Sequence, residues 1–424
     1  MTLKLHWQIL IALVLAIVVG SLTGTEAGIF GVAFYDVYQF IGSLFLNALK
    51  MLIVPLVVSS IIVGIAGIGS GSNLGRLGGK TVLYYFVTSL LAILVGLTLV
   101  NMISPGIVDG QPAKEMIGLT GDAASIQQKV EGKGAGDIAE VFLRMIPTNV
   151  VAAAANGQML GLIFFSLLFG YFLTRIQEAY AESQFNFWQG VYEIMMLITD
   201  WVMKFAPIGV FALVAKVVAS TGLAAFKPLA MFFFTVLLAL LVHFLVVLPL
   251  ILKFVAGVNP LRHYQAMAPA LLTAFSTSSS SATLPLTLEC VEKNAGVSNR
   301  TSSFVLPLGA TINMDGTALY ECVAAMFIAQ AYGIELGFAT QFAIVMVALL
   351  TSIGVAGIPS ASLVAIAIIL ATIGLPAEAI GLILAVDRVL DMCRTTVNVF
   401  SDSCGAVVIG RSEGEDKILQ DKPV

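Results

Sequence analysis

The chain is a series of long apolar stretches separated by short polar ones. Apolar runs long enough to cross a bilayer as a helix, about 20 residues, lie near 8–23, 38–68, 81–104, 157–176, 190–220 and 228–256. The runs 38–68 and 190–220 exceed a simple span and therefore predict strongly tilted helices. The first part of the chain thus predicts a bundle of membrane-spanning helices.

After residue 257 the apolar stretches become shorter and are interrupted by polar, glycine and proline clusters. SerThrSerSerSerSerAlaThrLeuPro occupies 276–285, AlaThrIleAsnMetAspGlyThr occupies 310–317 within an apolar stretch, and a second Ser/Gly/Pro cluster occupies 351–362. Irregular backbone at membrane depth is tolerated only where protein or a water-filled cavity surrounds it. Paired interrupted segments indicate a transporter site and the two halves of an internal repeat. Helix packing through small residues is the alternative, but four consecutive serines cannot all face one neighbour.

The segment 387–402 carries acidic, basic and amide groups inside an apolar context. On a helix, Asp387, Asp391, Arg394, Asn398 and Asp402 fall on one stripe about 80° wide that runs over four turns. Ionisable groups at membrane depth cost several kcal/mol unless they are paired or hydrated, so they mark ion or substrate pathways. This stripe predicts a site for a zwitterion together with a cation.

Composition agrees with a membrane protein and excludes several other classes. Of 424 residues, 58% are hydrophobic and 11% charged, whereas soluble domains carry about 25% charged residues. The net charge of −4 is diffuse, and there is no basic block, zinc-spaced Cys/His cluster or phosphate-binding loop. The four cysteines lack CxxC spacing and are interpreted as core thiols. We therefore expect neither nucleic acid nor an organic cofactor, and no enzymatic activity.

The distribution of basic residues predicts the orientation in the membrane. Lys4 and His6 precede the first apolar run, which we interpret as a membrane helix rather than a signal peptide, and Arg76 and Lys80 follow the second. The segment 24–36 lacks Lys and Arg. The positive-inside rule then places the N-terminus in the cytoplasm. By the same count 105–136 is an external loop, and the tail from about residue 411 is a frayed cytoplasmic end.

Four motifs in order resemble the glutamate transporter family of dicarboxylate/amino acid:cation symporters. They are SerSerSerSerAlaThrLeuPro (278–285), AsnMetAspGlyThr (313–317), GlyValAlaGlyIlePro (354–359) and AspMetCysArgThrThrValAsnVal (391–399). Each motif alone is weak, but the four together are highly specific. The resemblance implies an all-α membrane protein of the inner membrane, with eight transmembrane helices, two re-entrant helical hairpins and inverted repeats. It also implies a homotrimer of elevator-type transporters.

The resemblance divides the chain into a scaffold and a moving transport domain. The scaffold would comprise 1–75 (helices 1 and 2) and 137–222 (helices 4 and 5); the transport domain would comprise 76–104 (helix 3) and 223–410 (helix 6, hairpin 1, helix 7, hairpin 2 and helix 8). The external loop 105–136 and the cytoplasmic tail 411–424 complete the chain. Hairpin 2, with Gly354, Gly357 and Pro359, would be the gate over the site.

The stripe and its neighbours suit an acidic amino acid. The guanidinium of Arg394 offers a planar fork for a carboxylate, and the alternative is a structural ion pair with Asp387 or Asp391. Asp391 suits the substrate ammonium, and Asn398 and Thr317 can donate to the two carboxylates. By resemblance, Ser279, Ser280, Ile358 and Thr395 complete the pocket.

Sodium requires hard oxygen ligands rather than sulfur or imidazole. By resemblance, three cation sites are expected: Asp402 with Asn398, Asn313 and Gly309; backbone oxygens of Thr311, Ser352, Ile353 and Val355; and Asp315 and Asn313 with Tyr85, Thr88 and Ser89. The last three present their oxygens on one helix face, since they are spaced i, i+3 and i+4. Ordinary hydrogen bonding between helices is the alternative for that face.

Three further charged residues have less direct roles. Glu321 lies in an apolar stretch, where a carboxyl group favours its neutral form and can exchange a proton near neutrality; a neutral, hydrogen-bonded core residue is the alternative. Asp387 would orient Asn313 or Arg394. By resemblance a second arginine is expected at residue 278 or 392, but Ser278 and Met392 stand there. We therefore expect Arg388 to reach the same region along the helix.

The sequence predicts a secondary symporter that takes up aspartate or glutamate with sodium across the lipid bilayer, with Glu321 as the candidate for coupling a proton as well. A proton-coupled glutamate or C4-dicarboxylate carrier of the same family is the alternative. An ion channel fits an asymmetric zwitterion site less well. An intramembrane protease would require Asp315 and Asp391 as a dyad, or a Ser–His pair. His6, His243 and His263 lie outside the polar clusters of the sequence, which argues against the latter.

Overall fold

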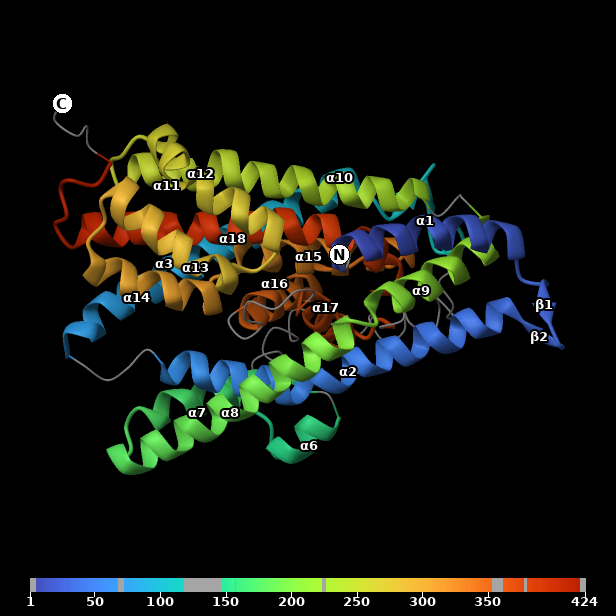
Figure 1. The fold of residues 1–424 in the computed structure, drawn as a ribbon, viewed down its shortest axis with the longest axis horizontal. Coiled ribbons are helices and arrows are strands. Elements are labelled where there is room, and N and C mark those ends of the chain that lie inside the picture. Colours follow the sequence, from blue (N-terminus) through green and yellow to red (C-terminus); the bar gives the residue numbers. More distant parts are fainter. Residues whose placement is uncertain are drawn as a thin grey trace.

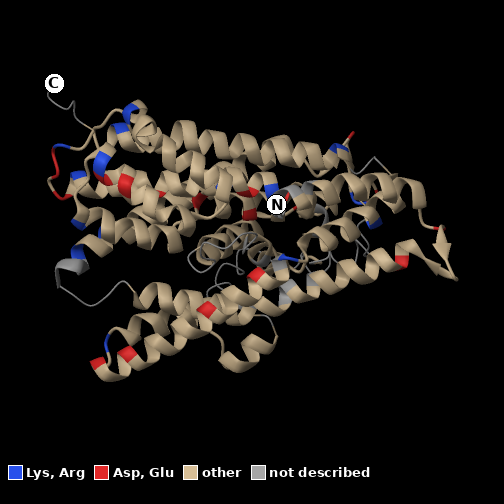
Figure 2. Ribbon diagram, in the orientation of Figure 1, with Lys and Arg blue, Asp and Glu red and all other residues tan. Residues whose placement is uncertain are grey.

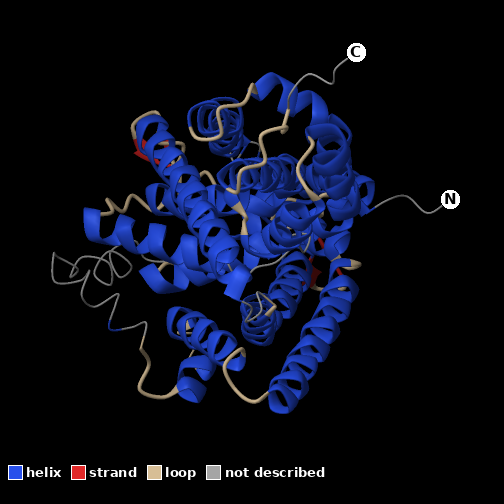
Figure 3. Cartoon of the chain, turned by 90° about the vertical axis from the view of Figure 1, so that its left-hand side faces the viewer, coloured by secondary structure: helices blue, strands red, loops and turns tan. Residues whose placement is uncertain are grey.

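The fold is almost entirely helical, with strands confined to two short hairpins (Figure 3). The computed structural model describes residues 5–67, 72–117, 143, 146–156, 158–222, 226–352, 361–376 and 380–419. Strand β1 (Gly28–Ile29) pairs antiparallel with β2 (Val32–Ala33), and β3 (Ile107–Val108) pairs antiparallel with β4 (Gln111–Pro112). The second hairpin opens the predicted external loop, of which residues 118–136 lie outside the described part.

One group of helices packs around the long helix α2. It consists of α1 (Leu5–Thr23), α2 (Phe34–Ala66), α6 (Val150–Ala155), α7 (Met159–Leu173), α8 (Glu178–Met203) and α9 (Ala206–Thr221). Helix α2 contacts α7, α8 and α9, and α9 also contacts α1. In Figure 1, α2, α7 and α8 form the lower layer of the molecule.

A second group surrounds α18. It consists of α3 (Ser72–Ile103), α10 (Phe226–Val242), α11 (Leu248–Phe254), α12 (Pro260–Thr277), α13 (Ser280–Glu289), α14 (Asn299–Ile312), α15 (Asp315–Ala331), α16 (Phe338–Ser352), α17 (Ala361–Ile373) and α18 (Ile380–Ser412), with π-helical turns η2 (His243–Val247) and η3 (Cys290–Ala295). Helix α15 is buried over nearly its whole length. Helix α15 contacts α3, α16, α17 and α18. In Figure 1, α18 lies below α10 and α12 and above α2.

The predicted apolar runs coincide with helices, but one of them is not a single span. Of the described residues, Arg76–Ile103 and Phe226–Phe254 each form a helix long and apolar enough to cross a membrane, and the bent pair Glu178–Val202 and Ala206–Thr221 gives a third span if taken as one. The run 190–220 was expected to be one tilted helix, which is wrong. It bends by 54° between α8 and α9, where Pro207 starts a new helix in its first turn.

The polar interruptions after residue 257 do break helices. Helices α12 and α13 are joined at Ser278, which adopts a left-handed conformation (φ 52°), and Ser279, whose hydroxyl accepts a hydrogen bond from the Ala282 amide at 3.2 Å. The serine run therefore supplies both the helix end and the next helix cap. Asn313 and Met314 are non-helical and separate α14 from α15. The segment between α16 and α17, with Gly354, Gly357 and Pro359, lies outside the described residues.

The segment after α18 is packed rather than frayed through Leu419, so the sequence-based expectation is wrong there. The Glu413 carboxylate forms ion pairs of 2.6 Å with both Arg76 and Lys80 of α3. Ile418 is 2% exposed, and the Leu419 amide donates to the Ala295 carbonyl at 2.9 Å. Residues 420–424 lie outside the described part.

Candidate functional site

The broken helix pair α14/α15 lies directly against α18. A Cβ atom on Gly316 would lie 2.7 Å from the carbonyl oxygen of Arg394, so only glycine permits this approach. The Gly316 amide donates to Asn398 Oδ1 at 2.8 Å, and Asn398 Nδ2 donates to Thr317 Oγ1 at 3.2 Å. The amide of Asn398 thereby joins the first turn of α15 to the centre of α18, where it is 3% exposed.

Arg394 lies at the centre of a buried charge network. One of its terminal nitrogens, Nη2, lies 2.9 Å from Asp391 Oδ1 and 3.1 Å from Asp387 Oδ1. The guanidinium carbon lies 3.9 Å from the centroid of the Tyr320 ring, and the side chain is 1% exposed. Within the part of the chain that the structure describes, its Nε and Nη1 have no hydrogen-bond partner. Buried charged donors without acceptors are costly, so this arginine retains capacity for a further anion.

Arg388 reaches the same carboxylate from one turn away. Its Nη1 lies 3.3 Å from Asp391 Oδ2, while Arg394 holds Oδ1 of the same group. The Arg388 side chain is 12% exposed, and its Nε is buried with no hydrogen-bond partner in the described ranges of the chain. Two guanidiniums therefore share the Asp391 carboxylate. The ion-pair alternative for Arg394 is present in the structure, together with donors that these pairs leave unused.

A second cluster of oxygen atoms lies one turn and more further along α18. Asn313 Nδ2 donates to Asp402 Oδ1 at 2.8 Å and to Ser401 Oγ at 3.1 Å. A Cβ atom on Gly309 would lie 2.6 Å from the Tyr85 hydroxyl and 2.7 Å from Asp402 Cγ, so Gly309 provides the space beside this carboxylate. The atoms of this cluster that could bind a cation are carboxylate, amide, hydroxyl or carbonyl oxygens, which suit a hard monovalent cation.

Asp315 is fully buried and receives hydrogen bonds from three helices. Ser89 of α3 donates to its Oδ1 at 2.7 Å; Ser401 of α18 donates to its Oδ2 at 2.6 Å; and His243 Nε2 lies 3.1 Å from Oδ2. Thr88 Oγ1 lies 3.5 Å from Asn313 Oδ1. Tyr85 donates instead to the Val305 carbonyl at 2.7 Å.

Sequence reasoning missed Ser401 and His243. The expectation that the histidines lie outside the polar clusters is wrong for His243, and His263 lies 2.9 Å from Ser403 Oγ on α18. A histidine inside a 29-residue apolar span is itself a signal of function at membrane depth. His243 begins the π-helical turn η2, which precedes Pro249; such turns are frequent at functional sites.

Glu321 lies on α15, one turn beyond Thr317, and bonds to α16. Thr351 Oγ1 is 2.9 Å from Glu321 Oε2, and the same hydroxyl lies 2.8 Å from the Val347 carbonyl and 3.0 Å from that of Ala348. Glu321 Oε1 is buried, with no hydrogen-bond partner among the described residues. A single hydroxyl hydrogen is thus shared among three acceptors if Glu321 is ionised.

For the remaining predicted site residues, the structure gives burial or contacts within their own helices. Ser280 and Thr395 are buried, and α13, which Ser280 begins, contacts α14 and α18. Thr311 and Ser352 use their hydroxyls on carbonyls of their own helices. Ile353, Val355 and Ile358 lie outside the described residues.

Apolar helices that bury a mixed charge network around interrupted segments define a membrane carrier protein. The chain belongs to the sodium:dicarboxylate symporter family, whose model matches residues 5–412. It is similar to the proton/glutamate-aspartate symporter of Escherichia coli (37% identity, covering 97% of this chain and 93% of the relative). The proton/sodium-glutamate symport protein of Geobacillus stearothermophilus is 37% identical (97% and 95%) and human excitatory amino acid transporter 3 is 36% identical (96% and 86%).

Proposed function

We propose that the protein is a secondary symporter that couples uptake of aspartate or glutamate to sodium. The observation that carries this proposal is the buried Arg394 guanidinium, whose Nε and Nη1 lack acceptors while Asp391 stands beside it. The side-chain carboxylate of the substrate would accept hydrogen bonds from these two nitrogens, and the substrate ammonium would pair with Asp391. The names of the bacterial and human relatives support the same substrates.

The rest of the substrate pocket follows from this placement. Asn398 and Thr317 are bonded to each other, and together they would hold the α-carboxylate and the side-chain carboxylate. Thr395 and the hairpin tip at Ser279 and Ser280 would close the near side. Ile358, in the segment between α16 and α17, would cover the opposite side of the pocket.

Arg388 would take part in this pocket by holding Asp391 while no substrate is bound. Its 3.3 Å contact with Asp391 Oδ2 occupies the oxygen that an ammonium would need. Substrate binding would therefore exchange one cation on Asp391 for another, so that Asp391 keeps a positively charged partner in both states. Asp387, bonded to Arg394 at 3.1 Å, would keep the guanidinium in position.

Sodium would be held by the oxygen clusters at the α14/α15 break. Gly309, Asn313 and Asp402 would form one site with Asn398; Asp315, Asn313, Thr88 and Ser89 would form another, with Tyr85 between them and Ser401 as an additional ligand. The contacts of 2.6–2.8 Å at Asp402 and Asp315 support two separate carboxylate sites. A further site would use the backbone around Thr311, Ser352, Ile353 and Val355.

Proton coupling is a second candidate, favoured by the surroundings of Glu321. A protonated Glu321 would donate to Thr351, which would then donate to the Val347 carbonyl, so each group would have one partner. The ionised form would leave three acceptors, Glu321 Oε2 and the Val347 and Ala348 carbonyls, competing for one hydrogen. Proton transfer at Glu321 would thus be coupled to the position of α16, the first helix of the proposed α16/α17 hairpin.

The architecture proposed for this activity has eight spans, two re-entrant hairpins (α12/α13 and α16/α17) and an elevator movement. The group around α18 would move against the group around α2, which would hold a homotrimer together. Both termini would face the cytoplasm. Lys and Arg gather at the end of the molecule that carries the C-terminus (Figure 2), which supports this orientation.

Uptake of labelled L-aspartate and L-glutamate into proteoliposomes tests the proposal. An inward sodium gradient should drive uptake, and replacing sodium with choline should abolish it, whereas Arg300→Gln should behave as the wild type. Uptake driven by a pH gradient alone in choline would favour the proton-coupled alternative. Uptake of succinate without aspartate or glutamate would contradict the assignment of Asp391 to an ammonium.

A further inference from the structure

A polar pocket lies at the end of the molecule that carries the C-terminal segment. Its volume is about 450 Å³, and it is lined by Gly257, Val258, Asn259, Arg262, Arg411, Ile418 and Leu419. These residues come from the turn between α11 and α12, the first turn of α12, the last turn of α18 and the packed C-terminal segment. None of them belongs to the substrate or cation clusters described above.

Two arginines from different helices define the chemistry of this pocket. Arg262 Nη1 donates to the Leu419 carbonyl at 3.2 Å. Arg411 Nε donates to the Ala256 carbonyl at 3.2 Å, and its Nη1 lies 3.3 Å from Asp416 Oδ1. The Asp416 side chain is 86% exposed, so water screens this ion pair strongly. The Asp416 carboxylate therefore offsets little of the positive charge of Arg411, whose Nη1 also donates to the Asp416 carbonyl at 2.9 Å.

The N-terminus of α12 adds to the positive potential. This helix has 18 residues, and its capping residue Asn259 and first-turn Arg262 both line the pocket. Helix N-termini attract anions through their amides and dipole. Planar guanidinium forks suit the oxygens of phosphate groups. An anionic, phosphate-bearing ligand is thus the class that fits.

The surroundings place this pocket at the depth of lipid headgroups. The apolar span Phe226–Phe254 ends only three residues before Gly257. Next to the pocket, Phe254, Val255 and Leu261 are 74%, 67% and 70% exposed. Apolar side chains in this position would lie in the outer hydrocarbon, with the arginines at the phosphate layer above them. Basic pockets of this kind between membrane helices bind anionic headgroups.

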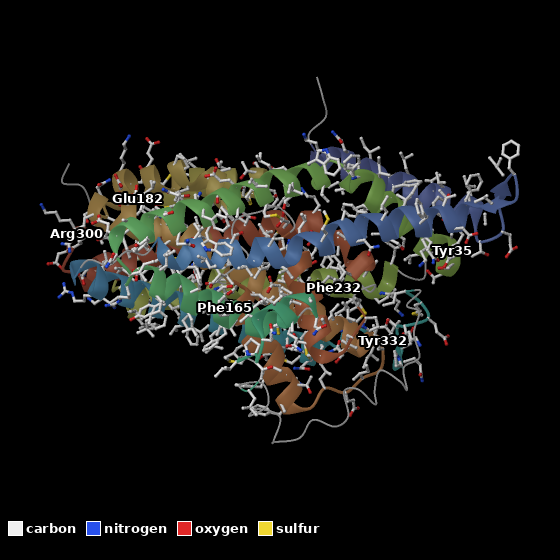
Figure 4. All side chains as sticks on the ribbon, turned by 90° about the horizontal axis from the view of Figure 1, so that it is seen from below. Tyr35, Phe165, Glu182, Phe232, Arg300 and Tyr332 are labelled. Atoms are coloured by element: carbon white, nitrogen blue, oxygen red, sulfur yellow. The ribbon has the colours of Figure 1, made fainter. Side chains whose placement is uncertain are left out.

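We propose that this pocket binds the phosphate headgroup of an anionic phospholipid, with Arg262 and Arg411 as its anchors. The exposed apolar flank argues for a lipid rather than for free phosphate, which would need only the polar wall. Because Ile418 and Leu419 form one wall, a bound lipid would also hold the C-terminal segment against α12. Figure 4 labels Arg300, which lies near the same end but does not line the pocket.

Native mass spectrometry of the purified, delipidated protein tests this site. After incubation with equimolar phosphatidylglycerol and phosphatidylcholine, the wild type should retain phosphatidylglycerol preferentially. Arg262→Gln should lower that retention about fivefold, the effect of one basic residue near an anionic surface. Arg262→Lys should largely restore it, and the control Arg300→Gln should match the wild type. A thermal unfolding midpoint close to the wild-type value would show that each variant is folded.

Three results would overturn the proposal. They are equal retention of the two lipids by the wild type, unchanged phosphatidylglycerol retention in Arg262→Gln, and an equal loss in Arg262→Lys. A fourth arm uses inorganic phosphate as competitor. If an excess of phosphate displaces phosphatidylglycerol completely, the pocket is a soluble-anion site and not a lipid site.

Discussion

Substitution of Gly309 by alanine isolates the role of the Asp402 carboxylate, because it adds one methyl group and leaves every proposed oxygen ligand in the chain. The new Cβ would lie 2.7 Å from Asp402 Cγ and 2.6 Å from the Tyr85 hydroxyl. Non-bonded carbon atoms approach to about 3.5–4.0 Å, so the carboxylate must retreat by about 1 Å. A hard cation lies about 2.4 Å from a carboxylate oxygen, and the retreat would lengthen this to about 3.4 Å.

The energetic consequence follows from Coulomb's law. At an effective dielectric constant of about 20, moving a unit charge from about 2.4 to about 3.4 Å weakens the attraction by about 2 kcal/mol. Sodium affinity should therefore fall about thirtyfold. Sodium titrations of aspartate binding by isothermal calorimetry measure this, with Gly79→Ala on α3 as the control, since a Cβ there meets nothing within 4 Å. A folded Gly309→Ala protein with an unchanged sodium dependence would refute a cation site beside Asp402.

Four further substitutions give distinct readouts. Arg394→Gln should lower aspartate affinity more than a hundredfold, because breaking a buried charge pair costs about 3–5 kcal/mol; binding within tenfold of the wild type would contradict its role. Glu321→Gln should make proteoliposome uptake insensitive to a pH gradient, whereas a preserved response would place proton coupling elsewhere. Ser401→Ala removes a 2.6 Å bond to Asp315 and should weaken sodium binding about tenfold, at about 1.5 kcal/mol; no change would exclude Ser401 as a ligand. Two basic side chains of α3 bonded to Glu413 hold the pKa of its carboxyl below its ordinary 4.5. The folded state thus gains stability above that pH and loses it as the pH falls through the lowered pKa, and Glu413→Gln should flatten the acid side of a thermal unfolding profile.

The periodicity of one helix was enough to predict which of its own side chains share a face. Asp387, Asp391 and Arg394 were placed on one stripe of α18, and the structure bonds Arg394 to both carboxylates. Periodicity does not determine which other helix that stripe faces. Ser401 and Asp315 are 86 residues apart in sequence, and His243 and Asp315 are 72 apart. Those contacts depend on tertiary packing, which only the structure supplies.

Helix breaks were predictable where the local chemistry is polar, and less so where it is apolar. The serine run 278–281 provides hydroxyls that cap a helix, so a turn there follows from the sequence. The break between α8 and α9 occurs within a mostly apolar run, where Lys204 and Pro207 mark it. The hydrophobicity of residues 190–220 alone therefore predicts one continuous helix. Similarly, the order of the tail through Leu419 arises from ion pairs with α3, a helix more than 300 residues earlier.

The hydrogen bonds around the α14/α15 break explain how cation and substrate binding would be coupled. Asn313 lies in the break and its side chain donates to Asp402 at 2.8 Å, whereas Gly316 follows the break and its amide donates to Asn398 at 2.8 Å. A cation that orders Asn313 therefore also restrains the amide that positions Asn398 for substrate. Only a few backbone torsions separate the two residues. The first ligand to bind would therefore lose the conformational entropy of ordering the break, and the second would bind to a break that is already ordered. The coupling must be reciprocal: aspartate should raise sodium affinity by the same factor by which sodium raises aspartate affinity.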